Sequence, residues 1–78
     1  MTIKKAVEIV FNRMPNTFHG LKFVQLVREQ AGRPYVYDAT VMRQLRKLRE
    51  EGKLDYEVIN NHTSKYKKKP IRGTIKTN

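Results

Sequence analysis

The sequence contains no cysteine and no tryptophan, and only seven of its 78 residues are acidic. Without cysteine the chain can form neither disulfides nor thiolate metal sites, which fits a reducing compartment better than secretion. The two histidines, His19 and His62, are far apart in the chain and make a poor zinc site. We therefore expect no metal and no cofactor, and we interpret His19 as a turn residue that is hydrogen-bonded to backbone.

Long apolar runs are also absent. The densest early stretch, Ile9 to Phe11, is far too short to cross a bilayer, and the first residues have the pattern of an amphipathic helix rather than of a signal peptide. The sequence shows no nucleophile–base–acid set and no Gly-rich phosphate loop. We expect a cytoplasmic protein that is neither a membrane protein nor an enzyme.

The length and composition allow one small core. A chain of 78 residues with 38% hydrophobic residues can build a single domain. Periodic patterns continue to about residue 69, whereas the last nine residues lack periodicity and carry Arg72 and Lys76. We therefore expect one domain over residues 1–69, followed by a basic flexible tail over residues 70–78.

Positive charge is abundant and unevenly distributed. Seventeen Lys and Arg residues against seven Asp and Glu residues give a net charge of +10. Residues 1–42 hold six basic and three acidic residues (net +3), whereas residues 43–78 hold eleven and four (net +7). A polyanion is therefore attracted mainly to the second half. Nucleic acid is the leading candidate, although an acidic protein or an anionic membrane surface could respond to the same field.

Two helices are predicted in the first half of the chain. Thr2 is a suitable N-cap, and apolar residues recur at helical spacing until Pro15 ends the pattern. Residues 15–20 are expected to form a turn in which Thr17 and Phe18 could be briefly extended, and a second helix is expected at about residues 21–31, ended by Gly32. Its apolar residues cover a wide arc, which indicates a helix sandwiched between neighbours. The apolar residues are Ile3, Ala6, Val7, Val10, Phe11 and Met14 in the first helix, and Leu21, Phe23, Val24, Leu26 and Val27 in the second.

The segment DATVMRQLRKLREEGK, residues 38–53, predicts a third and cationic helix. On a wheel of about 100° per residue, it has one narrow apolar stripe and a separate polar flank that contains no acidic residue. Arg46 and Arg49 point elsewhere. The stripe consists of Val41, Leu45 and Leu48, and the flank of Thr40, Arg43, Gln44 and Lys47. The alternative explanation is an ordinary amphipathic surface helix with solubilising charges.

Beyond the third helix the pattern changes from helical to alternating. Leu54, Tyr56 and Val58 alternate with acidic residues, as expected of a half-buried strand. We predict a hairpin with arms at Lys53–Ile59 and Ser64–Lys69, joined by a polar turn.

This order of elements resembles the winged helix-turn-helix family over roughly residues 2–69. The best-matching stretch is DATVMRQLRKLREEGKL, residues 38–54, in which a small residue and Thr precede Val, Arg, a spaced pair of Leu and an acidic-Gly exit. The resemblance implies a mostly α fold with a small β-hairpin, in which three helices carry a two-stranded wing.

The resemblance also implies a set of DNA contacts. In such proteins the third helix usually enters the major groove and contacts bases through its first turns. Arg43 has the fork geometry for guanine and Gln44 the amide pair for adenine, although either could hold a phosphate instead. The residues implied on this helix are Ala39, Thr40, Arg43, Gln44 and Lys47.

The hairpin corresponds to the wing of the family, which contacts phosphates or the minor groove. Its candidate contacts are His62 at the tip and a run of lysines, Lys65, Lys67, Lys68 and Lys69. The alternative is an exposed edge strand that lysines guard against sheet pairing. Because a guard needs fewer than four lysines in five residues, we favour phosphate contact.

Two tyrosines, Tyr35 and Tyr37, precede the third helix. They could pack the turn against the core, or place a hydroxyl on a backbone phosphate. The sequence favours neither interpretation.

Taken together, these features predict a small stand-alone, nucleoid-associated protein that binds double-stranded DNA for transcriptional regulation or DNA processing. The alternatives are sequence-independent binding to DNA or RNA, and a protein-interaction module whose basic face docks an acidic partner. The sequence shows no ligand-sensing domain, and a basic domain of this kind fits a protein of a phage or mobile element. A homodimer would have to form through the first helix, the wing or the tail.

Overall fold

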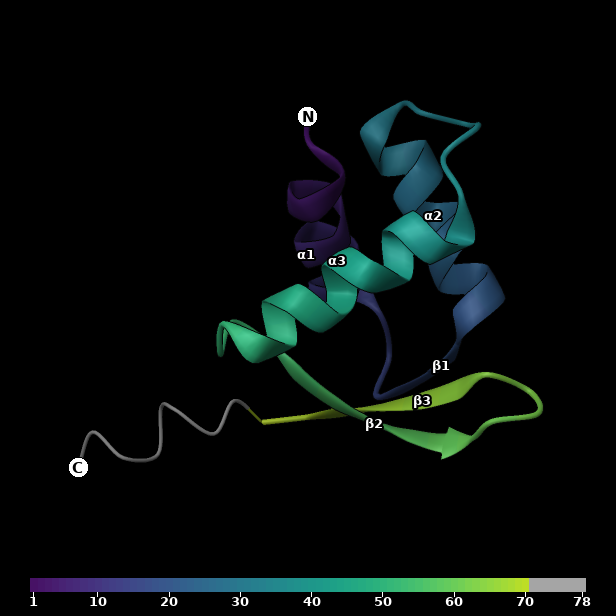
Figure 1. Ribbon diagram of the computed structural model, residues 1–78. Coiled ribbons are helices and arrows are strands. Elements are labelled where there is room, and N and C mark those ends of the chain that lie inside the picture. Colours follow the sequence, from purple (N-terminus) through teal and green to yellow (C-terminus); the bar gives the residue numbers. More distant parts are fainter. Residues whose placement is uncertain (71–78) are drawn as a thin grey trace.

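The computed structural model describes residues 1–70, which form three helices and a three-stranded antiparallel sheet (Figure 1). The tail predicted over residues 70–78 lies, apart from Pro70, outside the described residues. In chain order the elements are α1 (Ile3–Arg13), β1 (Thr17–His19), α2 (Gly20–Ala31), α3 (Asp38–Glu50), β2 (Asp55–Asn60) and β3 (Lys65–Lys69).

Helix α1 forms where the sequence predicts it. Thr2 Oγ1 accepts a hydrogen bond from the backbone N–H of Lys5 at 3.1 Å, which satisfies one of the unpaired donors of the first turn. All six predicted apolar residues are buried. Met14 leaves the helical conformation directly before Pro15, because a residue that precedes proline disfavours it.

Helix α2 also begins and ends close to the predicted positions, but the predicted burial is partly wrong. Gly32 ends the helix in the left-handed conformation, with φ 68°, which glycine adopts without steric cost. Phe23, Val24 and Val27 are buried, whereas Leu21 is 76% exposed. Leu21 lies in the first turn of α2 and lines a surface hollow together with Ser64 and Tyr66 of the hairpin. Within residues 1–70, no neighbouring element covers its side chain there.

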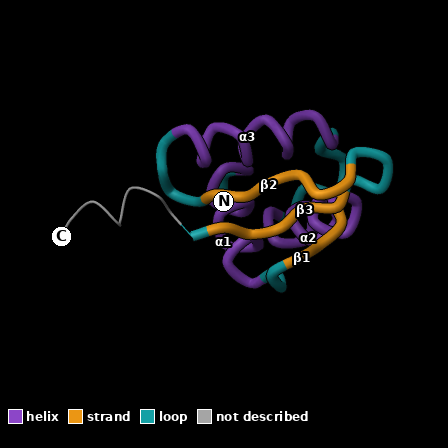
Figure 2. Tube along the Cα trace, turned by 90° about the horizontal axis from the view of Figure 1, so that it is seen from below, coloured by secondary structure: helices purple, strands orange, loops and turns teal. Residues whose placement is uncertain are grey.

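The sheet contains a strand that the sequence does not reveal. β3 lies between β1 and β2 and is antiparallel to both, so the prediction of a two-stranded hairpin is incomplete (Figure 2). Phe18 of β1 pairs with Tyr66 of β3. A strand of three residues with one apolar side chain is too short to establish an alternating pattern in the sequence, and its partner lies more than 40 residues later in the chain. The segment was therefore expected to be a turn with Thr17 and Phe18 briefly extended at most, and its pairing with the hairpin was not predicted.

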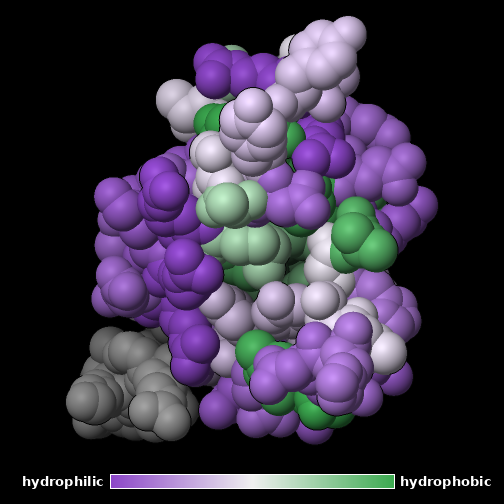
Figure 3. All heavy atoms as spheres, turned by 45° about the vertical axis from the view of Figure 1, so that its right-hand side comes forward, coloured by the Kyte–Doolittle hydropathy of each residue, from purple (hydrophilic) through white to green (hydrophobic). Residues whose placement is uncertain are grey.

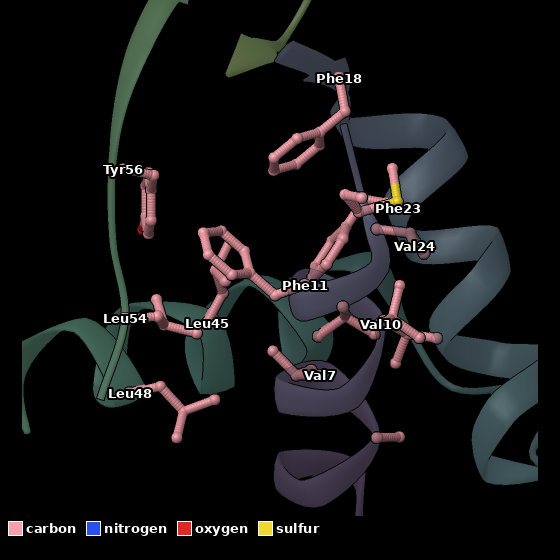
Figure 4. Packing of buried hydrophobic residues seen from close by; sticks show 14 of the residues in the cluster. Val7, Val10, Phe11, Phe18, Phe23, Val24, Leu45, Leu48, Leu54 and Tyr56 are labelled. Atoms are coloured by element: carbon pink, nitrogen blue, oxygen red, sulfur yellow. The ribbon is translucent and has the colours of Figure 1, made fainter. Parts of the chain in front are cut away.

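The core joins all three helices to the inner face of the sheet (Figure 4). The rings of Phe11 and Phe18 meet edge to face, with centroids 5.9 Å apart, and Phe18 also contacts Phe23 at 5.4 Å. Such aromatic pairs contribute about 0.5–1.5 kcal/mol each beyond the area that they bury. The ring of Tyr56 of β2 lies beside Phe11, at 6.3 Å, and closes the core on the hairpin side.

Helix α3 is anchored along its length and near both ends. Its stripe of Val41, Leu45 and Leu48 is fully buried, as the sequence predicts. Near its start, Arg28 donates to the Val36 carbonyl at 2.8 Å and to Asp38 Oδ1 at 2.6 Å. Just beyond its end, Lys4 Nζ of α1 pairs with Glu51 at 2.6 Å. The orientation of the outward face of α3 is therefore set by contacts with α1 and α2.

Candidate nucleic-acid interface

The outward face of α3 carries cations, but it is rotated from the flank that the sequence indicated. Ala39, Arg43 and Lys47 are exposed, as that prediction requires, whereas Thr40 and Gln44 are only half-exposed. On the wheel, Gln44 follows Leu48 by about 40°, so the flank with Thr40 and Gln44 borders the buried stripe. The direction opposite the stripe lies between Ala39 and Arg43.

Arg46 belongs to this face, although the sequence analysis set it aside. Its side chain is exposed on the helix, about 60° from Arg43 on the wheel. The centre of the buried stripe, rather than the position of the amide and hydroxyl side chains, is the signal that would have identified it. We define the α3 basic face as Ala39, Arg43, Arg46 and Lys47, with Gln44 at its margin.

The cations of the α3 basic face have no hydrogen-bond or ion-pair partner within residues 1–70, although Lys47 acts electrostatically on Glu51. Arg43, Arg46 and Lys47 form no hydrogen bond or ion pair there, and Glu50, which lies at helical spacing from Arg46 and Lys47, pairs with neither in the same range. Arg49 differs, because its Nε lies 3.3 Å from Asp55 Oδ1 and its guanidinium 4.8 Å from the Tyr56 ring centroid. Three cations of α3 are thus free for a ligand.

The lysines of β3 divide between the two faces of the sheet. Side chains alternate along a strand, so Tyr66 and Lys68 share the core face. Lys68 Nζ donates to the Met14 carbonyl at 3.0 Å and lies 5.3 Å from the Phe11 ring centroid. Lys68 therefore donates a hydrogen bond to the backbone at the end of α1. Of the four lysines predicted to contact phosphate, it is the one on the core face of the sheet. The outward lysines are Lys65, Lys67 and Lys69.

The interpretation of β3 as a guarded edge strand is wrong. β3 is the central strand, with β1 on one side and β2 on the other, so its backbone is paired on both edges (Figure 2). Across the sheet, Lys67 faces Glu57 of β2 and Thr17 of β1, while Lys69 faces Asp55. These acidic neighbours partly offset the positive charge of the outward lysines.

The turn between β2 and β3 is fixed rather than free. Asn60 Oδ1 accepts hydrogen bonds from the backbone N–H groups of His62 and Thr63, at 2.9 and 3.3 Å. The Gly20 N–H donates to the Ser64 carbonyl at 2.8 Å, and His19 Nδ1 lies 3.3 Å from the Thr63 carbonyl. His19 is therefore hydrogen-bonded to backbone as predicted. The His62 side chain remains exposed at the tip.

The two tyrosines before α3 do not pack on the core. Tyr35 is 91% exposed and Tyr37 is 77% exposed, so the interpretation of these rings as packing residues is wrong. Tyr37 contributes to the helix through its backbone, because its carbonyl accepts from the N–H groups of Thr40 and Val41. Both phenols are available to a ligand at the N-terminal end of α3.

Arg46 lies close enough to the hairpin to act on it electrostatically. Burial raises the pKa of Tyr66, the neighbouring Tyr56 raises it further, and the charge of Arg46 opposes both effects. The guanidinium thus lies within electrostatic range of the Tyr66 phenol. Arg46 is thus a cation of the α3 basic face whose charge acts on the hairpin.

Residues 1–70 contain no group of three or more His, Cys, Asp or Glu side chains that could hold a metal ion. In the same part of the chain, no helix has the length and apolar character needed to span a bilayer. Searches with protein-family models, against curated proteins and against solved structures found no match to this chain.

Proposed function

We propose that this chain is a winged-helix protein that binds double-stranded DNA, with α3 in the major groove. An α-helix with its side chains is about 10–12 Å wide, and the major groove is about 12 Å wide. Three helices on one core, with a cationic third helix followed directly by a hairpin, support this assignment. The order matches the family that the sequence resembles.

The observation that carries the proposal is the α3 basic face. Arg43 and Lys47 are exposed one helical turn apart on an anchored helix, and neither forms an ion pair within residues 1–70. A cationic surface that is not neutralised by its own protein attracts a polyanion. In this pose, Arg43 and Gln44 reach base edges, while Arg46 and Lys47 hold phosphates.

The hairpin supplies backbone contacts in the proposed complex. Lys65 and Lys67 lie on the outward face of β3 and contact phosphates, whereas Lys68 donates a hydrogen bond to the Met14 carbonyl. The phenols of Tyr35 and Tyr37 add hydroxyl donors beside the start of α3. These contacts position the protein, and the contacts from α3 select the sequence. A role in transcriptional regulation or DNA processing follows from such selection.

The test is selection from a random duplex library, followed by fluorescence anisotropy with the selected and a scrambled duplex at 50 and 200 mM salt. We expect enrichment of a short motif and a preference for the selected duplex at both salt concentrations. Contacts with about 6–8 phosphates would weaken binding on the order of a thousandfold over this salt range. Enrichment of no motif, together with a steep salt dependence, would instead support sequence-independent binding. No binding at 50 mM salt would refute the proposal.

A further inference from the structure

Exposed apolar side chains gather beside the α3 basic face rather than on it. Figure 3 shows pale and green side chains crossing a largely purple surface on the side of the molecule that includes the start of α2 and the end of the hairpin. A hollow of about 210 Å³ opens there between α2, α3 and the hairpin. We call it the Met42 hollow, and its apolar lining consists of Leu21, Val24, Met42 and Tyr66.

The close approach of two backbones forms the floor of the Met42 hollow. Gly20 donates to the Ser64 carbonyl, and a Cβ at Gly20 would lie 3.3 Å from both Ser64 Cβ and Tyr66 Cε1. Val58, the cross-strand neighbour of Tyr66, shares its face of the sheet and is 46% exposed. The hollow thus has a fixed floor, and the exposed Leu21 lies at its edge.

DNA is a poor occupant for this hollow. A duplex presents mainly charged phosphates and polar base edges, and its apolar groups in the major groove are the small thymine methyls, whereas Leu21 and Met42 offer a larger hydrophobic contact. An apolar hollow of this size can hold a single anchoring side chain of a partner protein, and such anchors contribute much of the binding energy in many protein interfaces. A side chain about the size of leucine or methionine, supplied by another polypeptide, fits the chemistry of the lining.

The surrounding charge selects the kind of polypeptide. Arg46 lies one helical turn from Met42 and close to Tyr66, while Asp38 at the rim is paired with Arg28 at 2.6 Å. Since the whole chain carries +10, a second copy would be repelled and an acidic segment attracted.

We propose that the Met42 hollow docks an acidic segment of a partner protein, which inserts one apolar side chain between Leu21 and Met42. This inference goes beyond the proposed DNA binding. Met42 and Arg43 are successive residues about 100° apart on the helix, so the two ligands occupy different faces of α3. Arg46, between the two faces, is the residue that both ligands contact.

The test uses a fluorescein-labelled helical peptide of Glu and Ala with leucines at positions i, i+4 and i+7, titrated into ¹⁵N-labelled full-length protein. We expect amide shifts at Leu21, Met42 and Ser64, and an affinity at least tenfold higher than for the same peptide with its leucines changed to serine. Leu21→Ser should lower the affinity for the leucine peptide about tenfold. Because Leu21 is 76% exposed, this variant retains its fold, which thermal melting verifies.

Arg43→Ala separates this inference from the proposed function. It should weaken duplex binding and leave the affinity for the leucine peptide unchanged. Equal binding of the leucine and serine peptides would mean that charge alone attracts them, which overturns the inference. Self-association in sedimentation experiments that Leu21→Ser abolishes would overturn it as well, because a second copy would then be the occupant.

Discussion

Helix α3 and strand β3 each carry four cations. In each element, one of the four interacts with a neighbouring part of the protein. In α3, Arg49 forms an ion pair with Asp55 and lies over the Tyr56 ring. In β3, Lys68 donates a hydrogen bond to the Met14 carbonyl. The remaining three differ in their neighbours. Those of α3 have no ion-pair partner within residues 1–70, whereas Lys67 and Lys69 of β3 face Glu57 and Asp55 across the sheet.

This difference shows that the number of lysines does not locate a polyanion site. β3 has the higher density of cations along the chain, yet its register places acidic residues beside them. The helical period separates the charges of α3 from its apolar stripe, and the acidic residues near this face, Glu50 and Glu51, lie at its C-terminal end. We therefore expect α3 to decide specificity and β3 to add affinity for any duplex.

The largest expected effect comes from truncating a buried side chain of α3 while all its charged side chains are kept. Leu45→Ala should lower the free energy of unfolding by about 2–5 kcal/mol, because Leu45 is fully buried and a cavity would remain. Urea denaturation measures this change. Leu21→Ala is the matched control and should change stability by less than about 0.5 kcal/mol, since its side chain is exposed. Similar losses for both variants would contradict the anchoring of α3.

The second expected effect concerns base recognition by α3. Arg43→Ala and Gln44→Ala should each reduce the preference for the selected duplex by about 1–3 kcal/mol, because each would lose a bidentate contact with a base. Competition anisotropy against scrambled duplex measures this preference. Lys5→Ala on α1 removes an exposed cation away from this face and should leave the preference unchanged. An unchanged preference in the α3 variants would assign both residues to phosphates.

The third expected effect separates Lys68 from its neighbour Lys67. Lys68→Met should destabilise the protein by about 0.5–1.5 kcal/mol, because the Met14 carbonyl loses its donor. Lys67→Met should leave stability nearly unchanged, since Lys67 is exposed. Thermal melting of the two variants, which carry the same charge, makes the comparison. If Lys67→Met proves the more destabilising, the assignment of the two faces of β3 is wrong.

The fourth expected effect concerns salt. Lys67→Gln should weaken binding equally for selected and scrambled duplexes and reduce the slope of log affinity against log salt by about 1. Lys5→Gln, with the same loss of charge, should leave the slope unaltered. A loss confined to the selected duplex would show that Lys67 contributes to sequence recognition.

The smallest expected effect lies at the contact between α1 and the end of α3. The hydrogen bond from Lys4 lowers the pKa of Glu51, so this pair stabilises the folded state above the unfolded pKa and loses that contribution as pH falls through the folded pKa. Lys4→Gln should return the Glu51 pKa towards its ordinary value, as measured by NMR titration of the carboxyl group. Because both side chains are exposed, the effect on stability should be slight. A Glu51 pKa unchanged by Lys4→Gln would show that the pair does not persist in solution.

Much of the helical structure could be predicted because its signals are local. The Thr2 cap, the stop at Pro15 and the left-handed Gly32 depend on neighbouring residues and were expected correctly. The buried stripe of α3 follows equally from the spacing of Val41, Leu45 and Leu48. The hairpin was also recovered, within two residues of its observed ends.

The candidate site was predicted less completely, because exposure depends on which elements pack together. The pattern indicated Thr40 and Gln44 as outward donors, yet their flank borders the buried stripe. Arg46 was expected to point away from this face, although it is exposed there and its charge acts on Tyr66 of the hairpin. Leu21 was assigned to a sandwiched helix and is instead exposed beside the Met42 hollow.

The sequence by itself determined the helices, the hairpin and the excess of positive charge, since caps, periodicity and composition are properties of nearby residues. Only the tertiary structure decided that β1 pairs with β3, that Lys68 turns towards Met14 and that the start of α2 meets the end of the hairpin. Each of these contacts joins residues more than 40 positions apart. No local pattern encodes such contacts, because they form only when the shared core brings distant segments together.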